Sequence, residues 1–198
     1  MSNKRFTLVI NPGATSTKAA IYEGEAEVFT ENISHPIEEI QQFHEIADQF
    51  DYRKSAILDM LDRHGVTRDQ VACIMGRGGL TRPCDAGTYR VNDLMRKECI
   101  EGVQGKHACN LGALIADSIA KEIGLENAFI ADPGIVDERP AYAKITGHPE
   151  FDLNPECEGV IWHCLNQRMT GKLYARELGK RYEDLNLIIA HMGGGVSV

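Results

Sequence analysis

Two short apolar runs in this chain each lead directly into a loop of small and polar residues. Residues 8–10 precede the segment Asn11–Lys18, and residues 187–190 precede a histidine and three consecutive glycines. A tight turn after a strand can direct unpaired backbone N–H groups at an anion, and glycine lets the backbone approach a ligand closely. Two loops of this kind predict a polyphosphate, and therefore a nucleotide, bound between them.

The first of these loops also carries side chains that suit phosphate. Gly13 permits a tight turn, and the hydroxyl groups of Thr15, Ser16 and Thr17 can donate hydrogen bonds. Lys18 adds a positive charge. These five residues are therefore candidates for binding the phosphates of a nucleotide.

Composition narrows the class of protein and its partners. The chain has 198 residues, which is long enough to bury a sizeable core, and a formal net charge of -8, which argues against an extended nucleic-acid partner. No apolar run is long enough to span a membrane, and the N-terminus lacks a signal-peptide pattern, so we expect a cytoplasmic protein. Six cysteines without a CxxC pair favour reduced, structural thiols.

Periodicity predicts a mixed α/β architecture. Expected strands cover residues 7–10, 19–22, 26–33, 71–75, 128–131 and 187–190, the first three as an antiparallel meander, and expected helices cover residues 37–64, 110–124 and 156–181. Asn110 is the expected N-cap of the second helix, and Gly124 its end. Strands followed by alternating helices and strands indicate a mixed sheet covered by helices.

A change of pattern near residues 140–155 predicts a boundary between two lobes. Prolines and a glycine interrupt any regular element there. Residues 1–140 then form a nearly complete first lobe, and residues 141–198 form the opening of a second lobe. One helix, one strand and one loop are too little to close a core, so we expect the chain to be a fragment or a shortened product.

Two common nucleotide motifs are absent from the sequence. There is no Gly-x-x-x-x-Gly-Lys-Ser/Thr loop, and Lys18 leads into an expected strand rather than into a helix. There is also no Gly-x-Gly-x-x-Gly between a first strand and a helix. The P-loop and dinucleotide-binding folds are therefore excluded.

Four segments instead resemble one known family. Residues 9–18 resemble the first phosphate motif of the acetate and butyrate kinases, members of the actin, Hsp70 and sugar kinase superfamily. Residues 76–80, 107–116 and 182–195 resemble butyrate kinases specifically, and the order of the four segments makes accidental similarity improbable. The resemblance implies a ribonuclease H-like (actin-like ATPase) fold with an incomplete second lobe. It also implies phosphoryl transfer between ATP and a short-chain carboxylate such as butyrate, with Mg²⁺, and self-association into a homo-oligomer.

The resemblance assigns catalytic roles to three residues. Arg77, at a strand end among glycines, matches the arginine that contacts substrate, and its guanidinium can hold a carboxylate or phosphoryl group with two hydrogen bonds. Asp132, before Pro133, matches an acidic residue near the phosphoryl group and the metal. A surface arginine and an ordinary Asp-Pro turn are the alternatives, and Asp137 or Glu138 could take the place of Asp132.

His163 is the third candidate, with a weaker match. It lies where acetate kinases have two histidines, the second of which is Gln167 here, and a packed core histidine is an equal alternative. Gln167 could still donate an amide hydrogen bond.

Further matches concern the nucleotide and the metal. Asn11 matches a position at the metal and Lys18 one at the nucleotide phosphates. The second phosphate motif comprises His191, Gly193, Gly194 and Gly195. For Asn11, Lys18 and His191 the alternatives are a turn residue, a solvated charge and a packed or capping histidine.

The leading expectation is a butyrate kinase or a relative that acts on branched short acids. A non-catalytic nucleotide-binding or oligomerising fragment is the alternative, and a sugar or glycerol kinase is disfavoured because those enzymes need a base for a hydroxyl group. The acyl-chain preference is not readable, because apolar pocket walls resemble ordinary core.

Overall fold

The computed structural model describes residues 5–145, 147–152, 163–193 and 195–198 of the chain, which form two compact units. Unit 1 consists of residues 1–82 and 87–131, and unit 2 consists of residues 83–86 and 132–198. The main passage from one unit to the other thus lies between Ala131 and Asp132. The lobe boundary expected near residues 140–155 stays a prediction.

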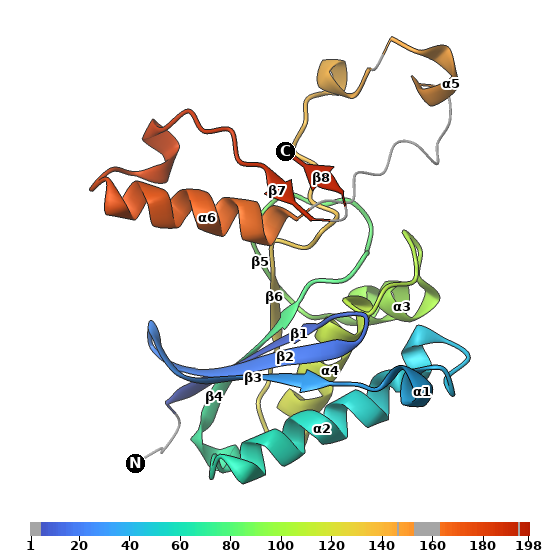
Figure 1. Cartoon of the computed structure of the whole chain (residues 1–198), viewed down its shortest axis with the longest axis vertical. Coiled ribbons are helices and arrows are strands. Elements are labelled where there is room, and N and C mark those ends of the chain that lie inside the picture. Colours follow the sequence, from blue (N-terminus) through green and yellow to red (C-terminus); the bar gives the residue numbers. More distant parts are fainter. Residues whose placement is uncertain (1–4, 146, 153–162, 194) are drawn as a thin grey trace. The chain divides into compact units, whose positions relative to one another are not determined.

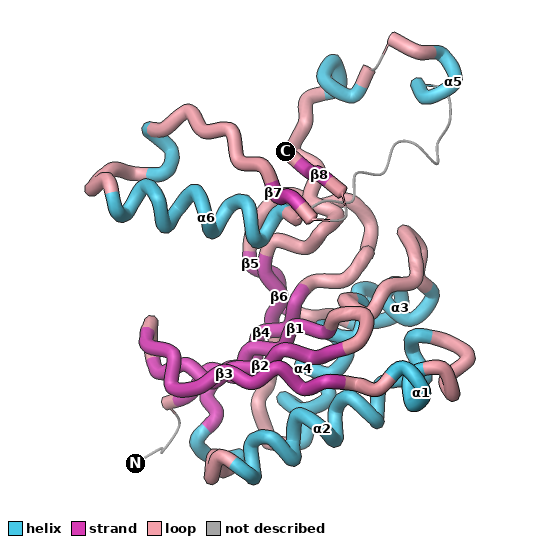
Figure 2. Tube along the Cα trace, in the orientation of Figure 1, coloured by secondary structure: helices cyan, strands magenta, loops and turns pink. Residues whose placement is uncertain are grey.

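Unit 1 is built on a six-stranded mixed sheet, drawn in magenta in Figure 2, with the strand order β3-β2-β1-β4-β6-β5. The strands are β1 (Phe6–Pro12), β2 (Ser16–Glu23), β3 (Ala26–Ser34), β4 (Val71–Arg77), β5 (Thr88–Arg90) and β6 (Phe129–Ala131). β1 is antiparallel to β2 but parallel to β4, and β4 is parallel to β6. The predicted mixed sheet is confirmed.

The N-terminal meander forms as the sequence predicts. β1 pairs antiparallel with β2, and β2 with β3. Alternate residues of β1, namely Phe6, Leu8 and Ile10, are buried, which is the period-two pattern of a strand with one face on the core. Gly24 has φ +61° in the turn between β2 and β3, a conformation that favours glycine.

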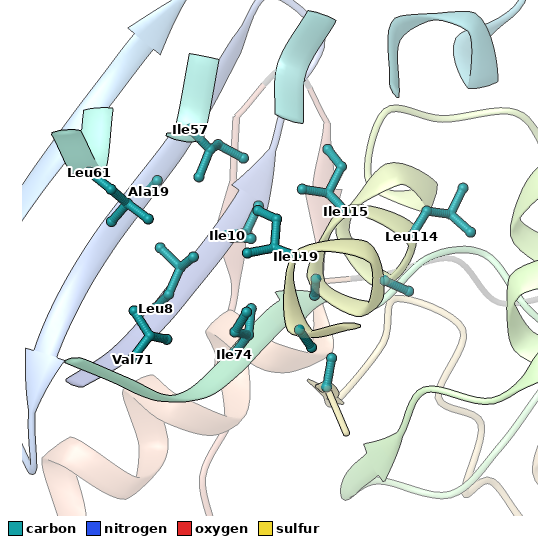
Figure 3. Packing of buried hydrophobic residues seen from close by; sticks show 14 of the residues in the cluster. Leu8, Ile10, Ala19, Ile57, Leu61, Val71, Ile74, Leu114, Ile115 and Ile119 are labelled. Atoms are coloured by element: carbon teal, nitrogen blue, oxygen red, sulfur yellow. The ribbon is translucent and has the colours of Figure 1, made fainter. Parts of the chain in front are cut away.

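Unit 1 contains four α-helices among its described residues, of which α2 and α4 contribute most of the helical part of the core. They are α1 (Ile37–Ile40), α2 (Phe50–Arg63), α3 (Asp93–Glu101) and α4 (Asn110–Glu122), with short 3₁₀ turns over Ile46–Gln49 and Arg68–Gln70. α2 and α4 lie side by side under the same face of the sheet (Figure 1). Ile57 of α2 and Ile115 of α4 meet Ile10 of β1 in the core (Figure 3).

Three sequence-based expectations for unit 1 are wrong. The helix expected over residues 37–64 is interrupted at residues 41–45: the short helix α1 precedes this break, and a 3₁₀ turn over Ile46–Gln49 follows it before α2 begins at Phe50. β5 and α3 were not expected. The side chain of Asn110 does not cap α4, because it bonds to groups outside the helix. The end of α4 is as predicted, since Gly124 follows with φ +74°.

Unit 2 contains a longer helix, short turns and a two-stranded hairpin. Its elements are α5 (Pro149–Asp152), α6 (Cys164–Glu177), β7 (His191–Met192) and β8 (Val196–Ser197), with 3₁₀ turns over Ala141–Lys144 and Tyr182–Asp184. α6 lies within the helix predicted over residues 156–181, of which residues 156–162 lie outside the described residues. The prediction of a strand at residues 187–190 is wrong, because this segment pairs with no strand among the described residues. The backbone oxygen of Ile189 accepts instead from Nε2 of Gln167.

Candidate functional site

The loop between β1 and β2, residues 13–15, is a compact turn with two backbone hydrogen bonds. The N–H of Gly13 donates to the oxygen of Ser16 at 2.7 Å, and the N–H of His35 donates to the oxygen of Thr15 at 2.9 Å. Ala14 and Thr15 are exposed at its tip. We call these residues the β1–β2 loop.

Arg53 of α2 lies beneath the β1–β2 loop and is fully buried. Its Nη1 donates to the oxygens of Gly13 and Ser16 at 2.9 and 3.1 Å, and its Nη2 donates to the oxygen of Ala14 at 2.9 Å. Nε donates to the side chain of Gln49 at 3.0 Å. Burial lowers the pKa of Arg53, but a guanidinium remains charged at any pH at which the protein is folded.

Thr17 continues this network into the protein. Its side chain is buried, and its hydroxyl oxygen accepts from Arg53 at 3.1 Å and lies 2.8 Å from Nε2 of His35. The tautomer of His35 sets which of the two groups donates in this bond, because the hydroxyl oxygen of Thr17 has two lone pairs. Burial and the charge of Arg53 lower the pKa of His35 to about 4, so its ring is neutral at neutral pH. Thr17 thus supports the loop from inside.

The outer side of the first motif presents polar groups to solvent. Asn11 and Lys18 are register partners on β1 and β2, and both are exposed. Ser16 is half-buried next to the exposed loop tip. Nη1 of Arg77 donates to Oδ1 of Asn11 at 3.3 Å, so the ends of β1 and β4 bring two of the predicted site residues together.

Arg77 is placed by a close crossing of β4 and α4. A Cβ added to Gly76 would lie 2.3 Å from the oxygen of Gly112, and a Cβ added to Gly112 would lie 2.3 Å from the oxygen of Arg77. Only glycine allows the strand and the helix to approach so closely. The backbone of Arg77 is therefore fixed against the helix, while its side chain is half-buried.

The glycine loop after Arg77 is held by Asn110. Its Oδ1 accepts from the N–H of Leu80 at 2.8 Å, and its Nδ2 donates to the oxygens of Cys99 and Gly105 at 3.3 and 3.0 Å. Asn110 is buried. One side chain thus ties the turn after β4 to the segment between α3 and α4.

His107 lies in the electrostatic neighbourhood of Arg77. Partial burial of the ring and the positive charge of Arg77 lower the pKa of His107. The N–H of Cys109 donates to Nδ1 of His107 at 3.1 Å, so the proton of the neutral ring is on Nε2. The ring can therefore donate one hydrogen bond from Nε2.

In unit 2, Asp132 adopts a strained backbone and faces a cation. It is the one non-glycine residue with positive φ among the described residues, at 36°. Nε of Arg168 lies 3.4 Å from its Oδ2, and Nη1 of Arg168 lies 3.5 Å from Oε2 of Glu138. Strained residues of this kind concentrate at functional sites.

Of the two sequence alternatives to Asp132, Asp137 is engaged elsewhere. Its side chain is 4% exposed and pairs with Arg139 and Lys144 at 2.9 and 2.8 Å. The hydrogen bond from Arg139 holds the pKa of Asp137 well below its usual range. Glu138 is half-exposed and accepts from the N–H of Ala86.

His163 and His191 stack face to face in unit 2. Their ring centroids lie 3.7 Å apart with planes inclined by 7°. Nδ1 of His163 lies 3.1 Å from Oγ of Ser197, and Nδ1 of His191 lies 3.1 Å from Oδ1 of Asn166. The two predicted histidines are thus neighbours. Gly193 and Gly195 are exposed beside β7, and Gly194 lies outside the described residues.

The side chain of Gln167 links α6 to the C-terminal segment of unit 2. Its Nε2 donates to the oxygens of Ile189 and Ser197 at 2.8 and 3.0 Å, and the side chain is buried. Both amide hydrogens are therefore used inside the unit, and none is left for a bound ligand.

The arrangement suits a magnesium nucleotide better than a metal held by protein alone. Among the described residues no group of three or more His, Cys, Asp or Glu side chains is placed to hold a metal ion. Mg²⁺ usually keeps several waters and takes one or two carboxylates together with phosphate oxygens. The carboxylate of Asp132 in unit 2 and the amide oxygen of Asn11 in unit 1 are each an oxygen ligand of this kind.

Comparison with known proteins identifies close relatives. No family model matches the chain. Butyrate kinase 1 of Clostridium acetobutylicum is 47% identical over 191 residues, and a probable butyrate kinase of Bacteroides thetaiotaomicron is 44% identical over 191 residues. Each alignment covers 96% of this chain and 52% of the relative, so the chain spans about half the length of the curated relatives it matches.

Solved structures show the same fold at low sequence identity. Acetate kinase of Porphyromonas gingivalis matches with a TM-score of 0.62 at 16% identity, covering 97% of this chain and 53% of that one. A propionate kinase from Francisella tularensis matches with a TM-score of 0.58 at 15% identity, over 97% and 53% of the two chains. The fold is therefore the predicted actin-like one. No helix in the described residues is long and apolar enough to cross a bilayer.

Sequence reasoning missed several residues of this region. Arg53 reads as a solvated charge on an amphipathic helix, and His35 as a loop residue. For His107 a signal existed, because it opens one of the segments that resemble butyrate kinases. Arg168 lies four residues from Cys164 on α6, on the buried side of an otherwise exposed helix turn, and its charge gave no separate signal.

Proposed function

This chain is a homologue of the butyrate kinases over almost its whole length, and from that relationship we propose that the protein transfers a phosphoryl group between ATP and a short-chain carboxylate such as butyrate. The products are an acyl phosphate and ADP. The observation that carries the proposal is 47% identity over 96% of the chain. The pairing of Arg77 with Asn11 at neighbouring strand ends supports it.

Electrostatics explains what the site must supply. A carboxylic acid is already ionised at neutral pH, so the acceptor needs no general base. It does need relief from repulsion by the triphosphate, which positive charge and fixed position provide. Arg77 is the residue proposed to hold the carboxylate or the phosphoryl group, since its guanidinium can bind either in a bidentate manner.

The nucleotide phosphates are proposed to meet both phosphate motifs. The outer side of the first motif is formed by Gly13, Thr15, Ser16 and Lys18. Thr17 supports this motif from inside the protein. In the second motif the proposed groups are His191 and the glycines Gly193, Gly194 and Gly195. Exposed hydroxyl, ammonium and backbone N–H groups are the donors that phosphate oxygens require.

Magnesium is proposed to accompany the nucleotide, where it would neutralise charge on the phosphates. Asn11 and Asp132 are the residues proposed to hold it, directly or through water. Nε of Arg168 lies 3.4 Å from Oδ2 of Asp132, and its positive charge favours the ionised carboxylate. His163 is the third proposed catalytic residue, and its stacking on His191 would fix its ring.

A second candidate function follows from the extent of the match. Because the chain spans 52% of the length of its relatives, it could bind the nucleotide or associate with another copy without catalysing the reaction. A cytoplasmic location and a homo-oligomeric state belong to the proposal as well.

Two measurements on the 198-residue chain test the proposal. Hydroxylamine trapping with butyrate, ATP and Mg²⁺ detects acyl phosphate, and isothermal titration with MgATP detects binding. Turnover supports the kinase, binding without turnover supports the non-catalytic alternative, and the absence of both contradicts the proposal. Arg77→Met should abolish product formation, whereas Arg90→Met, which removes an exposed arginine from β5, should not.

A further inference from the structure

Arg53 is a buried cation whose hydrogen bonds converge on one loop. Its side chain is fully buried on α2, and it makes five hydrogen bonds. Three go to the backbone oxygens of Gly13, Ala14 and Ser16, and one goes to the hydroxyl of Thr17. Four of the five bonds thus reach residues of the first motif or its flanks.

The charge of Arg53 is not neutralised by a carboxylate in the described part of the chain, where all five acceptors are neutral oxygens. Burying a charge without a counter-ion costs free energy, which the hydrogen bonds of the guanidinium must offset. Because most of these bonds reach the β1–β2 loop and its flanks, their main structural effect is to hold the conformation of this loop.

The geometry of the peptide bond determines where the N–H groups of the loop point. In a trans peptide the C=O of one residue and the N–H of the next point in opposite directions. Since the oxygens of Gly13 and Ala14 point inward to Arg53, the N–H groups of Ala14 and Thr15 point away from it. Among the described residues these two N–H groups have no hydrogen-bond acceptor, and both residues are exposed.

Two consecutive outward N–H groups form a concavity that suits an anion. We propose that Arg53 is a positioning residue that sets the β1–β2 loop for phosphate: it holds the loop oxygens inward, so that the N–H groups of Ala14 and Thr15 face a polyphosphate. This inference rests on the proposed function for the identity of the anion. The positive charge beneath the loop acts in the same direction, since it favours an anion on the outer side.

Three variants separate shape, charge and general stability. Arg53→Met removes the charge and every hydrogen bond but keeps an unbranched stem. Arg53→Lys keeps the charge but loses the planar fork that reaches several oxygens at once. Lys54→Met is the matched control, because Lys54 is the next residue of α2 and bonds instead to Ser118 and Glu122.

The first readout is hydrogen exchange at the amides of Gly13 and His35, which bond to the backbone oxygens of Ser16 and Thr15. We expect both Arg53 variants to accelerate exchange there at least tenfold while amides in the middle of α4 stay as in the parent. Lys54→Met should leave exchange at Gly13 and His35 unchanged, because the partners of Lys54 lie on α4 and not at the loop. Uniform acceleration across α4 in Arg53→Lys would show a merely structural role and overturn the inference, as would unchanged exchange at Gly13 and His35.

The second readout is binding of MgATP and of tripolyphosphate by isothermal titration. We expect Arg53→Met to weaken both at least tenfold, Arg53→Lys three- to tenfold, and Lys54→Met less than twofold. Equal affinities in Arg53→Met and Lys54→Met would overturn the inference. If the parent protein binds neither ligand, the proposed function and the phosphate role fail together, and the exchange data still decide whether Arg53 positions the loop. If Arg53→Met does not fold, Arg53→Lys carries both readouts.

Discussion

The backbone oxygen of Gly112 on α4 occupies the space that a side chain on Gly76 of β4 would need, because a Cβ added there would lie only 2.3 Å away. The helix and the strand that carries Arg77 are therefore in direct backbone contact. Any side chain at either glycine must push the two elements apart, and the position of Arg77 depends on the outcome.

Gly112→Ala should therefore destabilise the protein, although alanine is the better helix former. The added methyl group would overlap the backbone of Arg77, and overpacking of this kind costs about 1–3 kcal/mol or more. Urea denaturation measures the loss in the free energy of unfolding. Gly13→Ala is the control, since its Cβ would meet nothing closer than 3.4 Å, and equal losses in both variants would contradict the explanation.

His35 should make stability depend on pH in the mildly acidic range. Its pKa is about 4 in the folded protein and about 6.5 when unfolded, so the unfolded chain binds the extra proton between these values. Stability is thus fully present above about pH 6.5 and falls as the pH drops towards 4, by up to about 3 kcal/mol.

Denaturation curves of the parent and of His35→Gln between pH 4 and 7 measure this contribution. Glutamine cannot titrate, so the difference between the two proteins should shrink as the pH falls. A difference that stays constant with pH would show that His35 is not the titrating group.

Two variants of Asp132 separate the effect of its backbone strain from the effect of its carboxylate charge. Asparagine tolerates a left-handed backbone at least as well as aspartate, so Asp132→Asn should keep its thermal midpoint within a few degrees while MgATP affinity falls about tenfold or more. Asp132→Val should in addition lose about 1–3 kcal/mol, because a β-branched residue is strained at φ 36°. Unchanged nucleotide binding in Asp132→Asn would exclude the proposed role.

Gln167 should matter for the hairpin of unit 2 rather than for substrate. Gln167→Leu leaves the oxygens of Ile189 and Ser197 without their donor and should cost about 1–2 kcal/mol. The loss is limited, because Oε1 of Gln167 has no hydrogen-bond partner in the described residues. Denaturation of this variant is compared with Met169→Ala, an exposed position on α6 that should change stability by less than about 0.5 kcal/mol.

The sequence predicts well those features that depend on local periodicity. Alternate burial in β1 and a glycine turn at Gly24 are sufficient for the meander, and the three- and four-residue spacing of apolar residues is sufficient for α4. α3 was missed although its ends carry a signal: Asn92 accepts from the N–H of Met95, and Gly102 ends the helix with φ +67°. Its weak apolar pattern concealed these caps.

Features that depend on contacts distant in sequence could not be predicted. Asn110 has the residue type of an N-cap, yet its partners are Leu80, Cys99 and Gly105, which no local pattern identifies. Arg53 lies about forty residues from the loop it supports. For the candidate site, the resemblance to a known family identified Asn11, and the resemblance together with a strand end identified Arg77; the structure brings the two side chains together.

Arg53 holds the β1–β2 loop mainly by donating hydrogen bonds to main-chain oxygens, which every amino acid possesses. The path of the loop is consequently insensitive to the identity of the side chains at its tip. Substitutions at Ala14 and Thr15 could therefore change the side chains at the loop tip while the backbone of the loop keeps its conformation. This turn is a convenient place to engineer new anion preferences.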